Sequence, residues 1–255
     1  MTTSVTEAAL LPYLFGDDET SGWSRGMRAV THALLAARAL PPGPALEVGC
    51  GGGQFLAELR ARLAGRTVCG ADLHPLALAH AQRRASGASL TQATLEDLPW
   101  PADHFALVVA LDVFDQQGVD MAAALAEARR VLLPGGLLLM RVSAYPWLYG
   151  AHDVAFHTGR RYARRELAGA LAGAGFTVER MTHANAGLAA PVIVQRLAQR
   201  WGLLPWLPGL YGSGGLHGLA ATLLQREADW LRRGDLPLGL SLYALARKPL
   251  PGPRT

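Results

Sequence analysis

A short apolar segment that runs into a series of glycines constrains the fold of this 255-residue chain most strongly. Residues 45–48 read Ala-Leu-Glu-Val, and glycines alternate at positions 49, 51 and 53. Glycine adopts positive φ angles and lets the backbone approach a ligand with no Cβ in the way. The apolar residues that follow recur at helical spacing: Phe55, Leu56, Leu59 and Leu63. The local order is therefore strand, glycine turn and helix, and the start of such a helix aims unpaired N–H groups at a ligand.

An acidic residue ends the next predicted strand. Residues 67–72 read Thr-Val-Cys-Gly-Ala-Asp, so Asp72 stands where a carboxylate can accept hydrogen bonds from a ribose diol. The dinucleotide fingerprint Gly-x-Gly-x-x-Gly does not fit, because positions 54 and 56 are Gln54 and Leu56. A phosphate-binding loop requires Gly-Lys-Ser/Thr, and Lys248 is the only lysine of the chain. Taken alone, the turn also fits a tight connection that binds nothing.

Several segments together resemble one enzyme family. Leu46–Gly53 looks like motif I of the class I S-adenosylmethionine (SAM)-dependent methyltransferases. Residues 95–101 and 105–114 are similar to the adenine loop and fourth strand of that family, and residues 128–140 resemble its helix end, turn and fifth strand. The resemblance covers about residues 40–180 well and the final segment more loosely. It implies a SAM-dependent methyltransferase with S-adenosyl-L-methionine as cofactor and S-adenosyl-L-homocysteine as product.

The resemblance also implies which residues hold the cofactor, from its methionine end to its sulfonium. The methionine part is expected at Glu47, Gly49, Cys50, Gly51 and Gly53. Ribose and adenine are expected at Asp72 and Leu73, the adenine amino group at Asp97 and Leu98, and the sulfonium end at Leu111 and Asp112.

One position departs from the family pattern. The family commonly carries a Glu-His pair after the fourth strand, whereas this chain has Asp115 and Gln116 there. Glutamine donates and accepts hydrogen bonds but cannot take up a proton as histidine does. A catalytic role of that histidine is therefore not carried over to Gln116.

Alternating strands and helices predict the α/β fold class. We expect a Rossmann-like, seven-stranded, mostly parallel sheet with helices on both faces and an antiparallel last strand. Helices are expected at residues 74–86, 119–132 and 164–173, and the last two strands at 176–181 and 240–247. More than fifty residues separate those two strands, where a plain hairpin needs only a handful. The predicted parts are an N-terminal helical segment over the cofactor mouth (1–44), the SAM-binding core (45–181 and 237–249) and an inserted helical lid (182–236).

Aromatic and titratable side chains concentrate after the fifth strand, at the sheet edge where open α/β folds bind ligands. The series His152-Asp153, His157 and Arg160-Arg161-Tyr162 resembles a subset of bacterial small-molecule and cell-envelope methyltransferases. Histidine titrates near neutral pH, so His152 or His157 is expected to take a proton from the acceptor, with Asp153 or Tyr162 orienting it. A purely structural role of these residues is an equal alternative. No metal site is expected, because the spacing matches no strong ligand motif.

The lid carries tryptophans that suit a cover over an apolar acceptor or a dimer contact: Trp201, Trp206 and Trp230. Transfer from a sulfonium mainly requires in-line alignment and exclusion of water. The expected function is methyl transfer to an oxygen, nitrogen or carbon atom of a small, partly apolar metabolite, either a natural product or an envelope precursor. The alternative is an enzyme of the same fold that binds SAM or its product and catalyses a non-methylating cyclisation or isomerisation. A nonenzymatic binding module is a third interpretation.

Composition and charge limit the classes of partner that we expect for this chain. Half of the residues are apolar, which excludes a disordered chain. The net charge of +4 comes from scattered arginines without interleaved aromatic residues, so the expected partner is a small-molecule acceptor and not nucleic acid. Cys50 and Cys69 are expected to be reduced thiols of a bacterial cytoplasmic protein. We expect no signal peptide and no stable membrane insertion, and a homodimer is left open.

Overall fold

The computed structural model describes residues 21–36, 38–204 and 216–251. The predictions for residues 1–20 and for residues 205–215 of the expected lid, including Trp206, lie outside these ranges.

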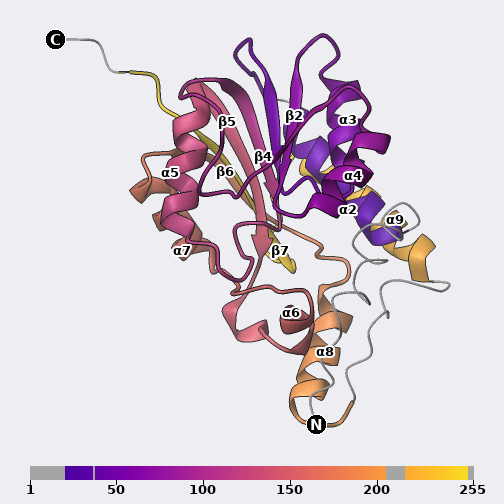
Figure 1. The fold of residues 1–255 in the computed structure, drawn as a ribbon. Coiled ribbons are helices and arrows are strands. Elements are labelled where there is room, and N and C mark those ends of the chain that lie inside the picture. The colour runs from indigo at the N-terminus through magenta and orange to yellow at the C-terminus, as the bar shows by residue number, and fades with distance from the viewer. Residues whose placement is uncertain (1–20, 37, 205–215, 252–255) are drawn as a thin grey trace.

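A seven-stranded sheet with the strand order β3-β2-β1-β4-β5-β7-β6 forms the centre of the molecule (Figure 1). Its strands are β1 Ala45–Val48, β2 Val68–Asp72, β3 Ser89–Gln92, β4 Phe105–Leu111, β5 Leu132–Ser143, β6 Thr177–Ala184 and β7 Ser241–Arg247. Among these strands, β7 pairs antiparallel with β5 and β6, and the pairs from β3 to β5 are parallel. The predicted fold class is confirmed.

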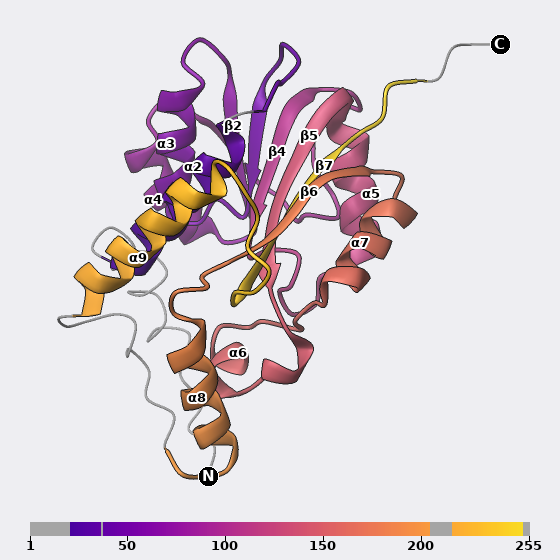
Figure 2. The same ribbon diagram turned by 180° about the vertical axis from the view of Figure 1, so that it is seen from behind.

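Helices cover both faces of the sheet (Figures 1 and 2). They are α2 Gly22–Leu35, α3 Gln54–Arg62, α4 Pro75–Arg84, α5 Met121–Val131, α6 Ala151–Ala155, α7 Arg164–Gly173, α8 Ala189–Arg200 and α9 Leu216–Leu231. Helices α5 and α7 bury leucines and alanines in one core layer, whereas α2, α3, α4 and α9 contribute to the layer on the opposite face. Strands β1 and β4 are buried along almost their whole length, as expected for parallel strands that are covered on both sides.

Helix α9 does not belong to a lid, in contrast to the prediction of a lid over residues 182–236. It packs along α2 on the sheet face (Figure 2), with Leu224, Ala228 and Leu231 fully buried. The two helices come close at Gly26, where a Cβ would lie 2.4 Å from Cβ of Leu224. Helical periodicity indicates which face of a helix is apolar but not which neighbour covers that face.

A smaller group of elements extends beyond the carboxyl ends of β4 and β5 (Figure 1). It consists of the short 3₁₀ helix η1 Pro146–Leu148, α6 and α8, and we refer to these three elements as the cap. The predicted helix over residues 164–173 coincides with α7. The turn predicted around residues 134–136 instead lies within β5, where the register against β4 shifts between Phe105 and Leu107.

Candidate functional site

The glycine turn between β1 and α3 is closed on two sides and open on the third. Gly49, Gly51 and Gly53 have φ angles of 68°, 50° and 80°, a region that L side chains rarely adopt. A Cβ at Gly49 would lie 2.3 Å from Cγ2 of Val113, and one at Gly53 would lie 2.7 Å from Cα of Ala81. Apart from its two chain neighbours, no described residue places a heavy atom within 4 Å of a Cβ built at Gly51. The turn therefore packs tightly at both ends and presents bare backbone to open space in its middle.

Asp72 holds this turn in place from the end of β2. Its Oδ2 accepts a hydrogen bond from the Gly51 N–H at 2.8 Å, and its Oδ1 accepts one from the His74 N–H at 2.9 Å. Arg84 of α4 adds a third contact by donating to the Gly52 carbonyl at 2.9 Å. A carboxylate oxygen has more than one acceptor position. Asp72 can thus fix the glycine turn and still accept hydrogen bonds from a diol in the adjacent space.

An ion pair between the buried Arg141 and the partly exposed Asp112 joins the carboxyl ends of β4 and β5. Arg141 binds both carboxylate oxygens of Asp112, with a distance of 2.8 Å from Nε to Oδ1. Its Nη1 also donates to the Tyr243 hydroxyl at 3.2 Å, and its guanidinium lies 5.5 Å from the ring centroid of Trp23 in α2. Burial opposes the charge of Arg141, but Asp112 and Tyr243 raise the pKa of the guanidinium, which stays protonated. The Asp112 carboxylate is thus engaged with the protein itself, and α2 is connected to this edge of the sheet.

Asp115 is a buried carboxyl group whose importance the sequence did not reveal. Its side chain accepts a hydrogen bond from the Ser143 N–H at 2.7 Å through Oδ2, while Oδ1 is buried without a hydrogen-bond partner among the described residues. Burial and the nearby charge of Asp112 raise the pKa of Asp115 to about 6. A group with such a pKa can take up or release a proton near neutral pH. From the sequence, Asp115 was visible only as part of the departure from the Glu-His pair.

His152 lies in α6 of the cap and is partly buried. Its ring stacks on Phe156, with 4.5 Å between the centroids. Burial and then the positive charge of Arg196 lower the pKa of His152 to about 4. The imidazole is therefore neutral at pH 7 and is a weaker base than a histidine with its ordinary pKa.

Asp153 connects the cap to the sheet. This residue is 1% exposed, and its Oδ1 accepts hydrogen bonds from Arg161 Nε at 2.9 Å and Nη2 at 2.7 Å. Its Oδ2 accepts from Arg196 of α8 at 2.8 Å, and Arg161 in turn donates to the Ala144 carbonyl at 2.9 Å. Burial favours the neutral form, but the two arginines hold the pKa of Asp153 below its ordinary value. Arg161 is thus engaged within the protein, where it pairs with Asp153 and donates to the Ala144 carbonyl.

His157 and Tyr162 occupy contrasting environments. His157 is exposed on the turn after α6 and has a φ angle of 55°, while its carbonyl accepts a hydrogen bond from the Gln117 N–H at 2.7 Å. Tyr162 is 3% exposed within the core, and the Arg160 guanidinium lies 4.6 Å from its ring centroid. Burial raises the pKa of Tyr162. Of these two predicted catalytic residues, His157 therefore lies at the surface and Tyr162 lies in the core.

The remaining predicted cofactor residues lie along the same edge of the sheet. Glu47 and Cys50 are buried, and burial and then Glu47 raise the pKa of the Cys50 thiol. Leu98 is buried and donates its N–H to Glu127 of α5 at 2.8 Å, so this N–H is already engaged. The others are exposed or intermediate in burial: Leu73, Asp97 and Leu111.

The described residues form neither a metal-binding cluster nor a membrane-spanning helix. No group of three or more histidine, cysteine, aspartate or glutamate side chains in the described ranges could hold a metal ion. None of the helices in those ranges combines the length and apolar character that a membrane crossing requires.

Comparison with known proteins gives a consistent result. A family model described as a methyltransferase domain matches residues 46–140. The chain is 34% identical over 131 residues to the uncharacterized methyltransferase YodH of Bacillus subtilis, which covers 49% of this chain and 53% of YodH. This chain thus spans about half the length of that relative. It is also 31% identical over 252 residues to an uncharacterized 37.1 kDa protein in transposon TN4556 of Streptomyces fradiae, covering 91% of this chain and 69% of that protein.

Solved structures share the fold at low sequence identity. A chain from the complex between the Haloferax volcanii Trm112 methyltransferase activator and a methyltransferase has a TM-score of 0.63 at 19% identity, covering 99% of this chain and 100% of that chain. The [4+2]-cyclase SpnF has a TM-score of 0.60 at 20% identity, with coverage of 93% and 87%. Geranyl diphosphate C-methyltransferase from Streptomyces coelicolor has a TM-score of 0.56 at 15% identity, with coverage of 89% and 79%.

Proposed function

This chain belongs to the class I SAM-dependent methyltransferase family, and from that premise we propose that it transfers a methyl group to an oxygen, nitrogen or carbon atom of a small, partly apolar metabolite. A natural product or an envelope precursor fits this description. The glycine turn is the observation that carries the proposal. At Gly51 the turn presents backbone to space that no described side chain occupies, next to a carboxylate that retains acceptor capacity.

The residues around the turn fit this cofactor. The backbone at Gly49, Cys50, Gly51 and Gly53, together with Glu47, would hold the methionine part, and Asp72 would bind the ribose hydroxyls. Leu73, Asp97, Leu98 and Leu111 remain proposals for the adenine and sulfonium surroundings. When bound, the cofactor supplies an electrophilic methyl group on a positively charged sulfur.

The rest of the site would position the acceptor and exclude water. The Asp112–Arg141 pair fixes the ends of β4 and β5 and anchors Trp23 of α2 beside them. Closing such a site orients the nucleophile and removes competing water. The cap would line the acceptor, and exposed rings on η1 and just after it, Trp147 and Tyr149, suit an apolar molecule.

Proton removal from the acceptor would fall to a group at this edge. His152 would act as a neutral, weak base, and His157 and Tyr162 remain proposals with less support, because one is exposed and the other lies in the core. Asp115 is the further candidate, since its pKa is raised to about 6 and its Oδ1 is buried without a partner among the described residues.

A methyl-transfer assay tests the proposal. The protein is incubated with methyl-labelled SAM and a panel of hydroxyl, amine and activated-carbon metabolites of graded apolarity. The expected result is labelled product together with an equal amount of S-adenosylhomocysteine. Cofactor binding without turnover across the panel would argue against methyl transfer.

A non-methylating reaction is the second candidate. The similarity to the [4+2]-cyclase SpnF and the Asp115-Gln116 departure from the family pair favour it. In that case product would form with S-adenosylhomocysteine alone and no label would be transferred. The same assay, repeated with S-adenosylhomocysteine in place of SAM, separates the two reactions.

The setting of the reaction is also a proposal. A bacterial cytoplasm fits the two buried free cysteines, Cys50 and Cys69, because thiols stay reduced there. The expected partner is the small-molecule acceptor.

The Trm112 complex among the structural neighbours concerns a protein partner of that methyltransferase. Whether this chain forms a homodimer is a separate question, which size-exclusion chromatography with light scattering would answer.

A further inference from the structure

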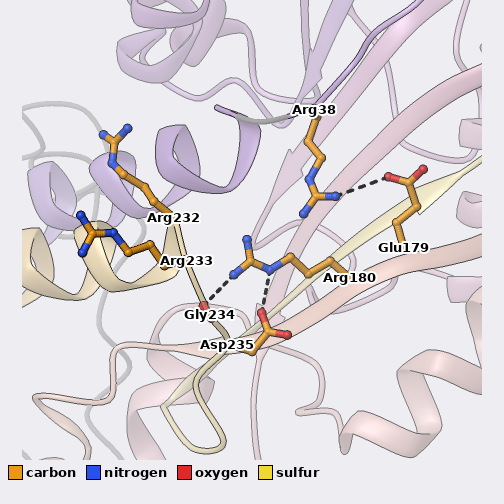
Figure 3. Close-up of a pocket in the computed structure, with 7 residues that line it drawn as sticks. All are labelled: Arg38, Glu179, Arg180, Arg232, Arg233, Gly234 and Asp235. Carbon is orange, nitrogen blue, oxygen red and sulfur yellow. Dashed lines mark hydrogen bonds and ion pairs between the residues drawn. The ribbon is translucent and has the colours of Figure 1, made fainter.

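A polar pocket of about 340 Å³ lies away from the glycine turn (Figure 3). It is lined by Arg38 after α2, by Glu179 and Arg180 of β6, and by residues 232–235 after α9. Strand β6 runs parallel to β4, because both β5 and β6 pair antiparallel with β7. The first half of β6 therefore lies at the edge of the sheet where the parallel strands begin. The glycine turn lies at the opposite edge, where those strands end.

The charges in this pocket do not balance. Arg247 binds both carboxylate oxygens of Glu179, with 3.1 Å from Nη2 to Oε2. Arg38 reaches the same carboxylate only at 3.9 Å. Arg180 is paired with Asp235 at 2.6 Å. Three guanidinium groups thus share two carboxylates, and one positive charge remains uncompensated within this group.

Some of the hydrogen-bond donors of Arg38 and Arg180 also have no acceptor among the described residues. The Arg38 guanidinium lies 3.9 Å from the Glu179 carboxylate, beyond hydrogen-bond distance, and its Nε, which solvent does not reach, has no partner among the described residues. Arg180 donates through Nε to Asp235 and through Nη2 to the carbonyls of Leu231 and Gly234, at 2.8 and 2.7 Å. Within the described ranges no residue accepts from its Nη1. Figure 3 shows both guanidinium groups reaching into the middle of the pocket.

Solvation alone does not account for this arrangement. The side chain of Arg180 is 13% exposed and that of Arg38 is 24% exposed, so water has limited access to them. Two arginines close to each other with free donors match an oxyanion, because the planar guanidinium forms paired hydrogen bonds with phosphate or carboxylate oxygens. Arg232 and Arg233 also line this pocket, and because Arg232 is paired with Asp229, Arg233 contributes the additional positive charge.

We propose that this pocket binds a phosphate group, either inorganic phosphate or the terminal phosphate of a small phosphorylated molecule. Arg38 and Arg180 bind its oxygens from two sides. A tetrahedral dianion offers more acceptor positions than a carboxylate, and its charge offsets the surplus of the surrounding arginines. The site is separate from the proposed cofactor site, so the two proposals stand or fall independently.

Calorimetric titration of the full chain with inorganic phosphate and with pyrophosphate, in a low-salt chloride buffer, tests the site. The expected result is saturable binding of one equivalent. Arg38→Gln is expected to weaken it at least about tenfold, because it removes the charge and the unused donors. Arg62→Gln, on the exposed end of α3, removes the same charge elsewhere and is the matched control, with affinity unchanged.

Affinity for S-adenosylhomocysteine and the melting temperature verify that each variant is folded, since Arg38 is remote from the glycine turn. Should Arg38→Gln be unstable, Arg233→Gln replaces it, with an expected loss of severalfold. Absence of saturable binding up to about 10 mM, a range that covers weak specific sites, would overturn the proposal. Equal losses in Arg38→Gln and Arg62→Gln would overturn it as well, since they would indicate nonspecific attraction. Binding of pyrophosphate but not phosphate would support a phosphorylated molecule as the source.

Discussion

Three glycines in one turn meet different demands at the scale of single residues. All have positive φ angles, but only Gly51 faces open space, whereas Gly53 faces Ala81 at 2.7 Å. The glycine pattern could be recognised from the sequence because a strand, three glycines and a helix leave few alternatives. Which glycine serves the ligand and which serves packing depends on neighbours that are distant in the chain.

Gly51→Ala and Gly53→Ala are expected to distinguish the role of Gly51 in ligand binding from the role of Gly53 in packing. Both introduce a left-handed alanine, which costs roughly 1–2 kcal/mol, and Gly53→Ala adds overpacking against Ala81 of about 1–3 kcal/mol. Gly51→Ala is therefore the more stable variant in urea unfolding but binds S-adenosylhomocysteine at least about tenfold more weakly than wild type. Wild-type affinity in Gly51→Ala would contradict the placement of the cofactor.

Asp72→Ala is expected to weaken S-adenosylhomocysteine binding by about ten- to a hundredfold. The substitution removes the acceptor for the Gly51 N–H together with the proposed ribose contact. Asp229→Asn removes an exposed carboxylate of α9 and is the control. A titration in which both variants bind equally well would remove Asp72 from the site.

The buried carboxyl of Asp115 predicts a pH dependence of stability. Its pKa is raised to about 6 by burial and then by Asp112. The contribution of protonated Asp115 to the stability of the folded protein is complete below the pKa of the unfolded chain, near 4. It is lost as the pH rises through the folded-state pKa of about 6. Asp115→Asn keeps the acceptor for the Ser143 N–H, so we expect it to gain stability relative to wild type above pH 6, by up to roughly 2–3 kcal/mol. Parallel thermal melts of wild type and variant from pH 4 to 8 measure the gain, and parallel curves would refute it.

At the level of helices and strands, the position of the cap relative to the sheet depends on the carboxylate of Asp153. Asp153 joins α6, α8 and the segment before α7 through Arg196 and Arg161. Asp153 and Arg161 stood out in the sequence as parts of the His-Asp and Arg-Arg-Tyr series, but as candidates for chemistry. Their pairing could not be predicted, because Arg196 lies 43 positions from its partner and arginines are frequent in this chain.

Asp153→Asn is expected to destabilise the protein by about 3–5 kcal/mol, because it leaves the buried Arg161 and the largely buried Arg196 without their counter-charge. Arg232→Gln, which breaks an exposed pair with Asp229, should cost less than about 1 kcal/mol. Because the pKa of Asp153 is lowered in the folded state, its contribution is present above the unfolded pKa near 4 and is lost as the pH falls below it. Urea unfolding at pH 7 and pH 3.5 should show the difference between wild type and Asp153→Asn shrinking at the lower pH.

At the scale of the whole molecule, the order of strands and helices followed from the sequence because alternating elements with a glycine turn and an acidic strand end admit few topologies. The role of α9 did not follow, since its apolar face fits a lid or a core layer equally well before α2 is placed beside it. The sequence likewise did not define the acceptor, because exposed rings such as Trp147 and Tyr149 suit many apolar molecules.

The central claim is that the glycine turn is the methionine end of a SAM site. A crystal structure of the protein grown with S-adenosylhomocysteine tests it most directly. We expect the homocysteine part along the backbone at Gly49–Gly53, with its closest approach at Gly51, and the ribose hydroxyls on Asp72. Ligand bound elsewhere, or an empty turn at a saturating ligand concentration, would contradict it.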